Sequence, residues 1–246
     1  MRLFYSPFHT FIHKVLVTAH EAGLWDDITF VATYPFKNSD GEDQGDAYSI
    51  AALNPLDKVP TLALSDGQIV FGSQAVVECL DGMNRSGTPL YPSAGPARWE
   101  AVSRLALADT LFETTVQMVM EGWHDEANQR TEFFEWIWPK TIRGLDHLEA
   151  YCKRGFGQFD IGQVAMLHAL SYMDFRAKFY AAKDPLYPDY DAFEKRPNLR
   201  SWWDEMIQRP YVVTHYNVDF AGNDSAQFCQ ANVRAVIELQ QANGTL

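Results

Sequence analysis

The first eighty residues alternate between short apolar runs and amphipathic runs. The apolar runs are "MRLFY", "DITFVATY", "VPTLAL" and "QIVF", and their length and β-branched or aromatic content predict strands. One amphipathic run from about residue 11 to 23, and another from Ser73 to about Leu80, predict helices. The polar step Ser65-Asp66-Gly67 predicts a turn between the last two strands. The order is βαβ followed by ββα, which predicts an α/β domain over residues 1–82.

Beyond residue 82 the pattern becomes helical. The segment "GMNRSGTPLYPSAGP" is rich in Gly, Pro and Ser, which predicts a linker over residues 83–96. From Ala97 to Glu121, apolar residues follow one stripe at steps of three and four. Similar amphipathic runs begin near Thr131, Asp160 and Asn198. These runs predict an all-helical domain over residues 97–246.

The last part of the chain, from about residue 217, predicts a helical extension. Asp224 or Ser225 is suited to cap a helix that runs to about Ala242, and Asn243-Gly244 is suited to end it. We expect this extension to cover the helical domain or part of a ligand pocket.

Composition and charge narrow the class of protein. The 246 residues are 47% hydrophobic, which is ample for a sizeable core, and the formal net charge is −12. Nucleic acid and anionic membranes are disfavoured as partners, because both require clustered Lys and Arg. The start lacks the apolar region of a secretory signal, and the longest charge-free stretch, residues 161–173, is too short to span a bilayer. Three widely spaced cysteines suggest neither a disulfide framework nor a zinc site. We therefore expect a soluble, cytoplasmic protein.

Four stretches carry a resemblance to a known family. They are "SPFHTFIHKV", "LNPLDKVPTLALSDGQIVFGSQAVVECLD", "FDIGQVAMLHALSYMDFR" and "RPNLRSWWDEMIQRP". Over roughly residues 1–216 the chain resembles a bacterial glutathione S-transferase. The resemblance implies a thioredoxin-like domain followed by a helical bundle whose capping box is Asp160 with Gln163. It also implies a homodimer that uses glutathione as co-substrate, and detoxification by attack on a small hydrophobic electrophile.

The resemblance implies a glutathione site around Pro60 and Ser73. Pro60 is expected to be cis, which would leave the N–H and C=O of Val59 free to pair with the backbone of glutathione; the alternative is an edge-strand proline with no ligand. Ser73 is expected to cap its helix and, by the resemblance, to hold the γ-glutamyl carboxylate. Lys58 is either a partner of the glycyl carboxylate or a solvated lysine. Gly72 departs from the family, which usually has an acidic residue there.

An acidic residue interrupts the apolar stripe of the long helix. A carboxylate at Asp109 must be paired, hydrated or at an interface, and a solvent-facing edge is the simplest explanation. In a family-like dimer, Asp109 is a second candidate for the negative charge that Gly72 cannot supply to the glutathione amine.

The thiolate-activating residue is expected in the opening stretch. Aligning "HKV" at residues 13–15 with the family's "RKV" places His9 where serine-type relatives keep the catalytic hydroxyl. Thr10 follows, and Ser6 precedes in the Ser-Pro turn. A neutral His9 donates a hydrogen bond that favours the thiolate. Thr10 has a suitable hydroxyl but also fits a helix N-cap. We rank His9 first and Thr10 second.

Two further sets of residues have competing explanations. Phe8, Phe112, Met120 and Trp123 are candidates for the wall of an apolar substrate pocket, or are core residues. The stretch "WHDE" at residues 123–126 lacks a further ligand one helical turn away, so we expect no metal site.

The cysteines discriminate between activities within the family. Thiol-exchange relatives carry a cysteine at the start of the first helix, and Cys79, Cys152 and Cys229 all lie elsewhere. Glutathione itself is therefore the expected nucleophile of a transferase. The alternative is a binding or scaffold protein with little catalysis, which Gly72 and the missing serine at position 9 favour.

Overall fold

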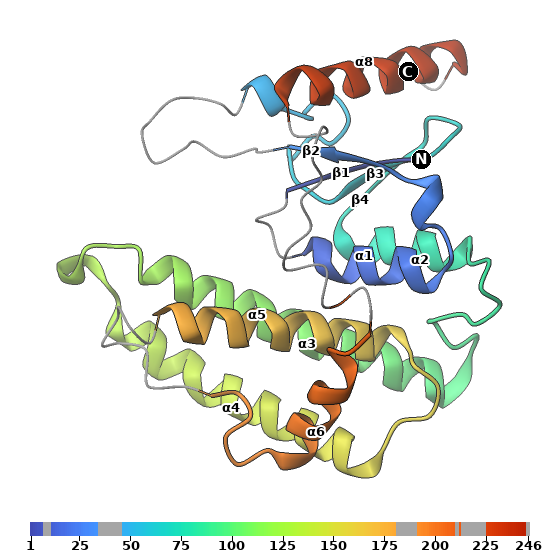
Figure 1. Ribbon diagram of the computed structural model, residues 1–246. Helices are drawn as coiled ribbons and strands as arrows, with labels where there is room; N and C mark the ends of the chain where they lie inside the picture. The colour runs from blue at the N-terminus through green and yellow to red at the C-terminus, as the bar shows by residue number, and fades with distance from the viewer. Residues whose placement is uncertain (7–10, 34–45, 181–190, 210–211, 213–224, 245–246) are drawn as a thin grey trace. The chain divides into compact units, whose positions relative to one another are not determined.

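A computed structural model describes residues 1–6, 11–33, 46–180, 191–209, 212 and 225–244 (Figure 1). The chain divides into two compact units. The first contains Met1–Leu90 together with Thr214–Leu246, and the second contains Tyr91–Val213. The first unit is built on a β-sheet and the second is helical, so the predicted sequence of a thioredoxin-like domain and a helical domain is confirmed.

The sheet of the first unit has four strands in the order β2-β1-β3-β4. They are β1 (Arg2–Tyr5), β2 (Thr29–Ala32), β3 (Thr61–Ala63) and β4 (Ile69–Phe71). β1 runs parallel to β2 and antiparallel to β3, and β4 is antiparallel to β3. Leu3, Phe4 and Tyr5 are all buried. Consecutive strand residues point to opposite faces, so both faces of the sheet must be covered.

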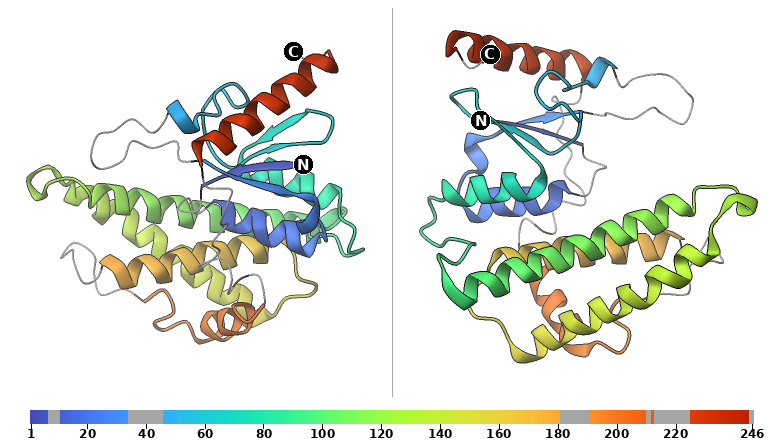
Figure 2. Two further views of the ribbon diagram at one scale, coloured as in Figure 1. Left: turned by 45° about the horizontal axis from the view of Figure 1, so that its top comes forward. Right: turned by 180° about the vertical axis from the view of Figure 1, so that it is seen from behind.

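Helices cover these two faces from different parts of the chain. One face carries α1 (Ile12–Glu21) and α2 (Ser73–Gly82), and the other carries α8 (Ala226–Ala242), as the views in Figures 1 and 2 agree. Short 3-10 turns, η1 (Trp25–Asp27) and η2 (Asp46–Tyr48), flank β2 in sequence. The core between the sheet and α8 consists of Phe4, Val31, Ile50, Leu53, Ala63, Cys229, Val233 and Val236.

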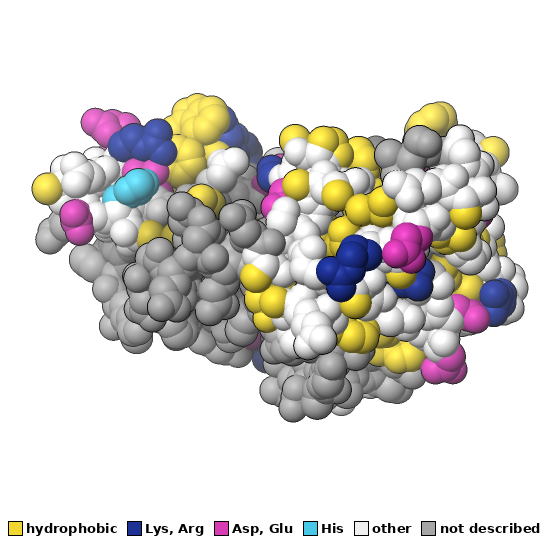
Figure 3. All heavy atoms as spheres, turned by 90° about the horizontal axis from the view of Figure 1, so that it is seen from above, with side chains coloured by type: hydrophobic (Ala, Val, Ile, Leu, Met, Phe, Trp, Pro, Cys, Tyr) yellow, Lys and Arg dark blue, Asp and Glu magenta, His cyan; other side chains and the backbone are white. Residues whose placement is uncertain are grey.

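The C-terminal helix forms as predicted but packs elsewhere. The Ser225 hydroxyl caps it by accepting a hydrogen bond from the N–H of Phe228 (3.1 Å), and Gly244 follows its end with φ +67°. The expectation that this extension covers the helical domain is wrong, because α8 packs on the sheet of the first unit. Arg234 and Glu238 lie on its exposed face. The view from this side shows side chains of both charges among hydrophobic and polar ones (Figure 3).

Among its described residues, the second unit contains four long or medium helices. They are α3 (Gly95–Glu121), α4 (Thr131–Arg154), α5 (Ile161–Tyr180) and α6 (Pro197–Met206), with the short η3 (Glu126–Asn128) before α4. The Asp160 carboxylate accepts a hydrogen bond from the N–H of Gln163 (3.1 Å) and pairs with Arg104 of α3. The predicted cap of α5 is therefore present, and it also joins α5 to α3. Across the described residues, no helix is long and apolar enough to cross a membrane.

Candidate functional site

The sheet topology brings three separate segments to one edge. Phe4 lies opposite Thr61 in the antiparallel pairing of β1 and β3, and Thr61 lies opposite Phe71 in the pairing of β3 and β4. The residues that follow β1, precede β3 and follow β4 therefore meet at the same edge. These residues include Ser6, Val59 and Ser73, which the sequence analysis selected from distant positions.

The segment before β3 presents an unpaired backbone. The Val59–Pro60 peptide bond is cis, as the resemblance implies. Neither the N–H nor the C=O of Val59 is paired with another described residue. The carbonyl of Lys58 accepts hydrogen bonds from Asn54 Nδ2 and Thr61 Oγ1, both at 2.8 Å. The backbone is thus held on one side of Val59, while Val59 itself offers a donor and an acceptor to an extended ligand.

A polar network that sequence reasoning missed fixes this segment. Asp57 has φ +49°, in the left-handed region that Asp tolerates better than most residues. Its carboxylate accepts hydrogen bonds from the N–H of Ile50 (2.6 Å) and from the Ser49 hydroxyl (3.0 Å). Its own N–H donates to the carbonyl of Asn54 (2.8 Å). The turn residues in "LNPLDKVP" were the available signal, but the partners Ser49 and Ile50 were not predictable from it.

The start of α2 differs from the expected capping arrangement. The N-cap residue is Gly72, not Ser73, and Ser73 is the first helical residue. Gly72 has φ +86°, a conformation that glycine adopts without strain and that an acidic residue would not. The Ser73 side chain is partly exposed, and its hydroxyl bonds to no other described residue. The first turn of α2 contains no acidic residue, so its N–H groups and positive dipole end are suited to an anion.

The third segment lies mostly outside the described residues. His9, Thr10 and Phe8 fall in residues 7–10, which the structure does not describe. Ser6 is fully buried, and its hydroxyl has no hydrogen-bond partner within the described part of the chain. Direct contact between Ser6 and a bound thiolate would require the surrounding atoms to move.

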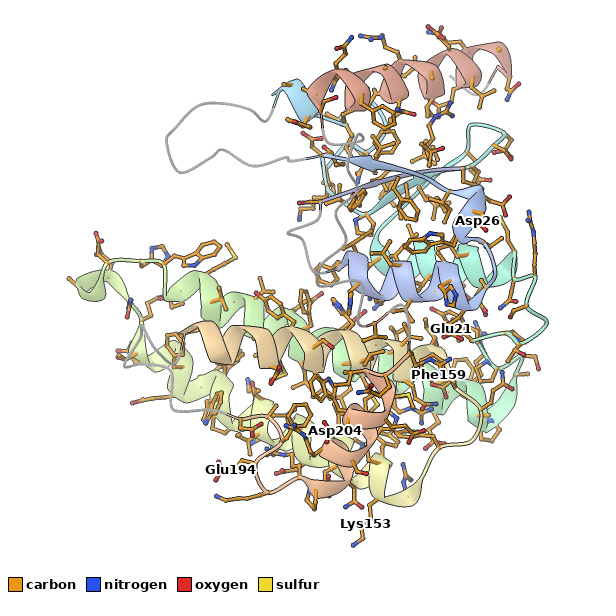
Figure 4. All side chains as sticks on the ribbon, in the orientation of Figure 1. Glu21, Asp26, Lys153, Phe159, Glu194 and Asp204 are labelled. Carbon is orange, nitrogen blue, oxygen red and sulfur yellow. The ribbon has the colours of Figure 1, made fainter. Side chains whose placement is uncertain are left out.

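The N-terminal turn of the helix that follows, α1, carries no negative side chain. The N-cap residue of α1 is Phe11, which forms no side-chain cap, and the first turn has no acidic residue. Glu21 and Asp26 lie at the far end of α1 and in the turn beyond it (Figure 4). These two negative charges are therefore separated by the length of the helix from an anion at its N terminus.

Of the four apolar pocket candidates, the structure describes Phe112, Met120 and Trp123, and these differ in burial. Phe112 is fully buried in the core of the helical unit, where its ring contacts those of His168 (4.5 Å between centroids) and Tyr172 (4.9 Å). Met120 lies in the last turn of α3 and Trp123 follows the helix, and they are 52% and 66% exposed. Phe112 is thus placed as a core residue, which was the second of the two explanations for this set.

The two charged candidates also differ from one another. Lys58 is exposed, which suits either a solvated lysine or one that binds a carboxylate. Asp109 is only 5% exposed, so the expected solvent-facing edge is wrong for this residue. A side chain buried to this extent is poorly available to a ligand or to a second subunit. No group of His, Cys, Asp and Glu suited to a metal occurs among the described residues.

The cysteines are placed unfavourably for thiolate chemistry. Burial raises the pKa of Cys79, and the nearby Asp66 carboxylate raises it further. Burial, aided by the Glu149 carboxylate, raises the pKa of Cys152 to about 12. Burial also raises the pKa of Cys229. Reactive cysteines typically have a lowered pKa, whereas the pKa of each of these three is raised.

Known proteins share both the sequence features and the fold. Residues 8–83 match the family model of the glutathione S-transferase N-terminal domain. The uncharacterized GST-like protein YibF of Escherichia coli (strain K12) is 27% identical over 180 residues, which are 72% of this chain and 83% of that protein.

Solved structures extend the similarity to the helical unit. A glutathione transferase family member from Pseudomonas fluorescens Pf-5, with bound glutathione, is 28% identical at a TM-score of 0.73. The match covers 87% of this chain and 97% of that one. A glutathione S-transferase from Methylobacillus flagellatus KT, with glutathione bound, is 25% identical at a TM-score of 0.73, over 88% and 99% of the two chains.

The sheet, the cis-proline segment and the helical unit define a two-domain protein of the thioredoxin-like and all-helical type. Its N-terminal domain matches the glutathione S-transferase family model, and most of the chain is similar to solved glutathione transferase family members.

Proposed function

We propose that the chain binds glutathione at the sheet edge and activates its thiolate for attack on a small hydrophobic electrophile. The observation that carries the proposal is the unpaired backbone of Val59 beside the open N terminus of α2. The N–H and C=O of Val59 are suited to the cysteinyl backbone of glutathione. The N–H and hydroxyl of Ser73 are suited to the γ-glutamyl carboxylate, and exposed Lys58 to the glycyl carboxylate. The relatives whose structures hold glutathione support this assignment.

The proposed reaction uses the thiol of glutathione as the nucleophile, because the pKa of each cysteine of this chain is raised. The glutathione thiolate attacks the electrophilic carbon, a C–S bond forms, and the leaving group departs with the electron pair of the broken bond. The protein contributes by lowering the thiol pKa and by orienting the thiolate. Asp109 has no role in this proposal, because its burial leaves little of its carboxylate accessible.

A binding or scaffold protein with little catalysis is the second candidate, and Gly72 is the residue that favours it. Without an acidic side chain there, the glutathione amine lacks one expected partner. Two measurements separate the candidates: calorimetric titration with glutathione, and conjugation of glutathione to a chlorinated nitroarene. A transferase gives binding and chloride release, whereas a scaffold gives binding alone. If millimolar glutathione does not bind, both are contradicted.

The thiolate-activating residue is proposed to be His9, with Thr10 second. A hydrogen bond donated to the sulfur favours the charged form, so removing the donor raises the thiol pKa of bound glutathione. We expect His9→Ala to shift the pH midpoint of the ultraviolet thiolate absorbance upward, and Thr10→Ala to shift it less. If neither change moves the midpoint while glutathione still binds, both assignments are wrong, and the dipole of α1 would be the remaining source of activation.

We also infer a symmetric homodimer in the cytoplasm, as the family resemblance implies. Several large apolar side chains are more than half exposed, and an interface between two copies would remove such groups from water. They are Leu56, Trp99, Met120, Trp123 and Trp136. Light scattering is expected to give twice the 28.0 kDa mass of one chain. A single-chain mass at micromolar concentration would contradict the dimer.

A further inference from the structure

The part of α8 from Cys229 to Val236 covers the segment that leads to the cis-proline. Buried Ile50 and Leu53 share a hydrophobic cluster with Cys229, Val233 and Val236 of α8. Tyr48 and Val59 are partly buried against the same cluster. The side chain of Val59 therefore packs into the layer between the sheet and α8, while its backbone stays unpaired. The C-terminal helix α8 thus contacts the side-chain side of Val59, whose backbone is proposed to bind glutathione.

Hydrogen bonds connect α8 to the same segment in a continuous series. Gln230 Nε2 donates to the carbonyl of Ser49 (2.9 Å). The Ser49 hydroxyl donates to the Asp57 carboxylate, which also accepts from the N–H of Ile50. Asp57 directly precedes Lys58 and Val59 in the chain. A displacement of Ser49 would therefore move Asp57 through their side-chain hydrogen bond, and Val59 lies only two peptide bonds after Asp57.

The C-terminal half of α8 makes a similar contact far from the site. Gln240 Nε2 donates to the carbonyl of Gly67 (3.0 Å), and Asn243 Nδ2 donates to the carbonyl of Asp66 (2.7 Å). These carbonyls belong to the turn after β3, whereas Pro60 precedes β3. The two ends of α8 thus hold opposite edges of the sheet with bonds of the same chemical type.

We propose that α8 positions the glutathione-binding segment and that Gln230 is a positioning residue for it. This inference rests on the proposed function. It concerns α8, which lies outside the family signature in residues 1–82. Because α8 holds residues 48–59 in the free protein, the entropic cost of ordering them falls on the folding step. Glutathione binding therefore does not have to offset that cost. Loss of the Gln230 contact transfers that cost to the binding step.

The test compares Gln230→Ala with Gln240→Ala. Each variant removes the hydrogen bond from a glutamine of α8 to a backbone carbonyl, so both should lower the melting temperature. Only Gln230→Ala should weaken glutathione binding, by about fivefold in Kd measured by calorimetry. Hydrogen exchange of the free proteins supplies the second measurement. The Ile50 amide, which donates to Asp57, should exchange faster in Gln230→Ala and at the wild-type rate in Gln240→Ala.

The outcomes distinguish this inference from the proposed function. Equal Kd values and equal Ile50 exchange in the two variants would overturn the positioning role of Gln230. Failure of the unmodified chain to bind glutathione would overturn the proposed function, and the exchange rates would still decide whether α8 orders the segment. Faster exchange in Gln230→Ala with an unchanged Kd would overturn the link between order and affinity.

Discussion

Replacing Gly162 with alanine is expected to lower the free energy of unfolding by about 1–3 kcal/mol, the range for overpacking a close contact. A Cβ atom at Gly162 would lie 2.6 Å from the carbonyl oxygen of Ala101 and 2.7 Å from Cβ of Arg104. Both atoms are close to the backbone of α3, so neither moves aside without a shift of the helix. Gly162 lies in the first turn of α5, where Asp160 caps that helix and pairs with Arg104. The substitution therefore forces apart the two helices that this cap joins.

Gly144→Ala is the matched control for this prediction. Gly144 is also helical and also lies in the second unit, but its Cβ would meet the side-chain end of Leu111, at 2.8 Å from Cδ2. A leucine side chain can rotate, and alanine favours the helix over glycine by about 1 kcal/mol, so the net change should be small. Urea denaturation of both variants measures the difference. If the two substitutions lower the free energy of unfolding equally, the close contact between Gly162 and the backbone of α3 does not explain the loss of stability.

Replacing Ser73 with alanine is expected to raise the Kd for glutathione about 5-fold to 150-fold, which corresponds to about 1–3 kcal/mol for a hydrogen bond to a charged group. The same change should leave the melting temperature nearly unaltered. Gly72 occupies the N-cap position, and the Ser73 hydroxyl bonds to no described residue, so no cap is lost. The combination of reduced affinity and retained stability would identify a hydroxyl that acts on the ligand.

Ser65→Ala provides the control for ligand specificity. Ser65 is exposed in the turn between β3 and β4, at the opposite edge of the sheet from Ser73, and its hydroxyl is also unpaired among the described residues. Its removal should change neither stability nor affinity. Calorimetry on both variants decides the assignment, and an unchanged Kd for Ser73→Ala would remove Ser73 from the proposed site.

Local sequence patterns were sufficient for most elements of the fold. The alternation of short apolar runs with amphipathic runs predicted the four strands and the helices between them, because strand and helix periodicities are properties of neighbouring residues. The cap at Ser225 and the glycine at Gly244 correctly placed both ends of α8. Asp160 correctly marked the start of α5. The resemblance added the cis bond before Pro60, which spacing alone had left open.

The site was predicted less completely, because its parts depend on contacts between distant segments. Ser73 was expected to cap α2, but the positive φ of Gly72 makes that glycine the cap and leaves the serine hydroxyl unpaired. Phe112 fitted both a pocket and a core, and only its neighbours His168 and Tyr172 placed it in the core. Asp57 carried a turn signal, yet its hydrogen bonds to Ser49 and Ile50 could not be inferred from spacing.

The sequence by itself determined which segments are strands and which are helices, and it placed both ends of α8. It also contains Cys229, Val233 and Val236 at steps of four and three along α8, where they form its buried face. It did not determine which surface that face covers, since burial of apolar area has no direction and any exposed apolar surface satisfies it. Only the tertiary structure decided that α8 packs on the sheet, because there Phe4, Ile50 and Ala63 form the surface that fits it.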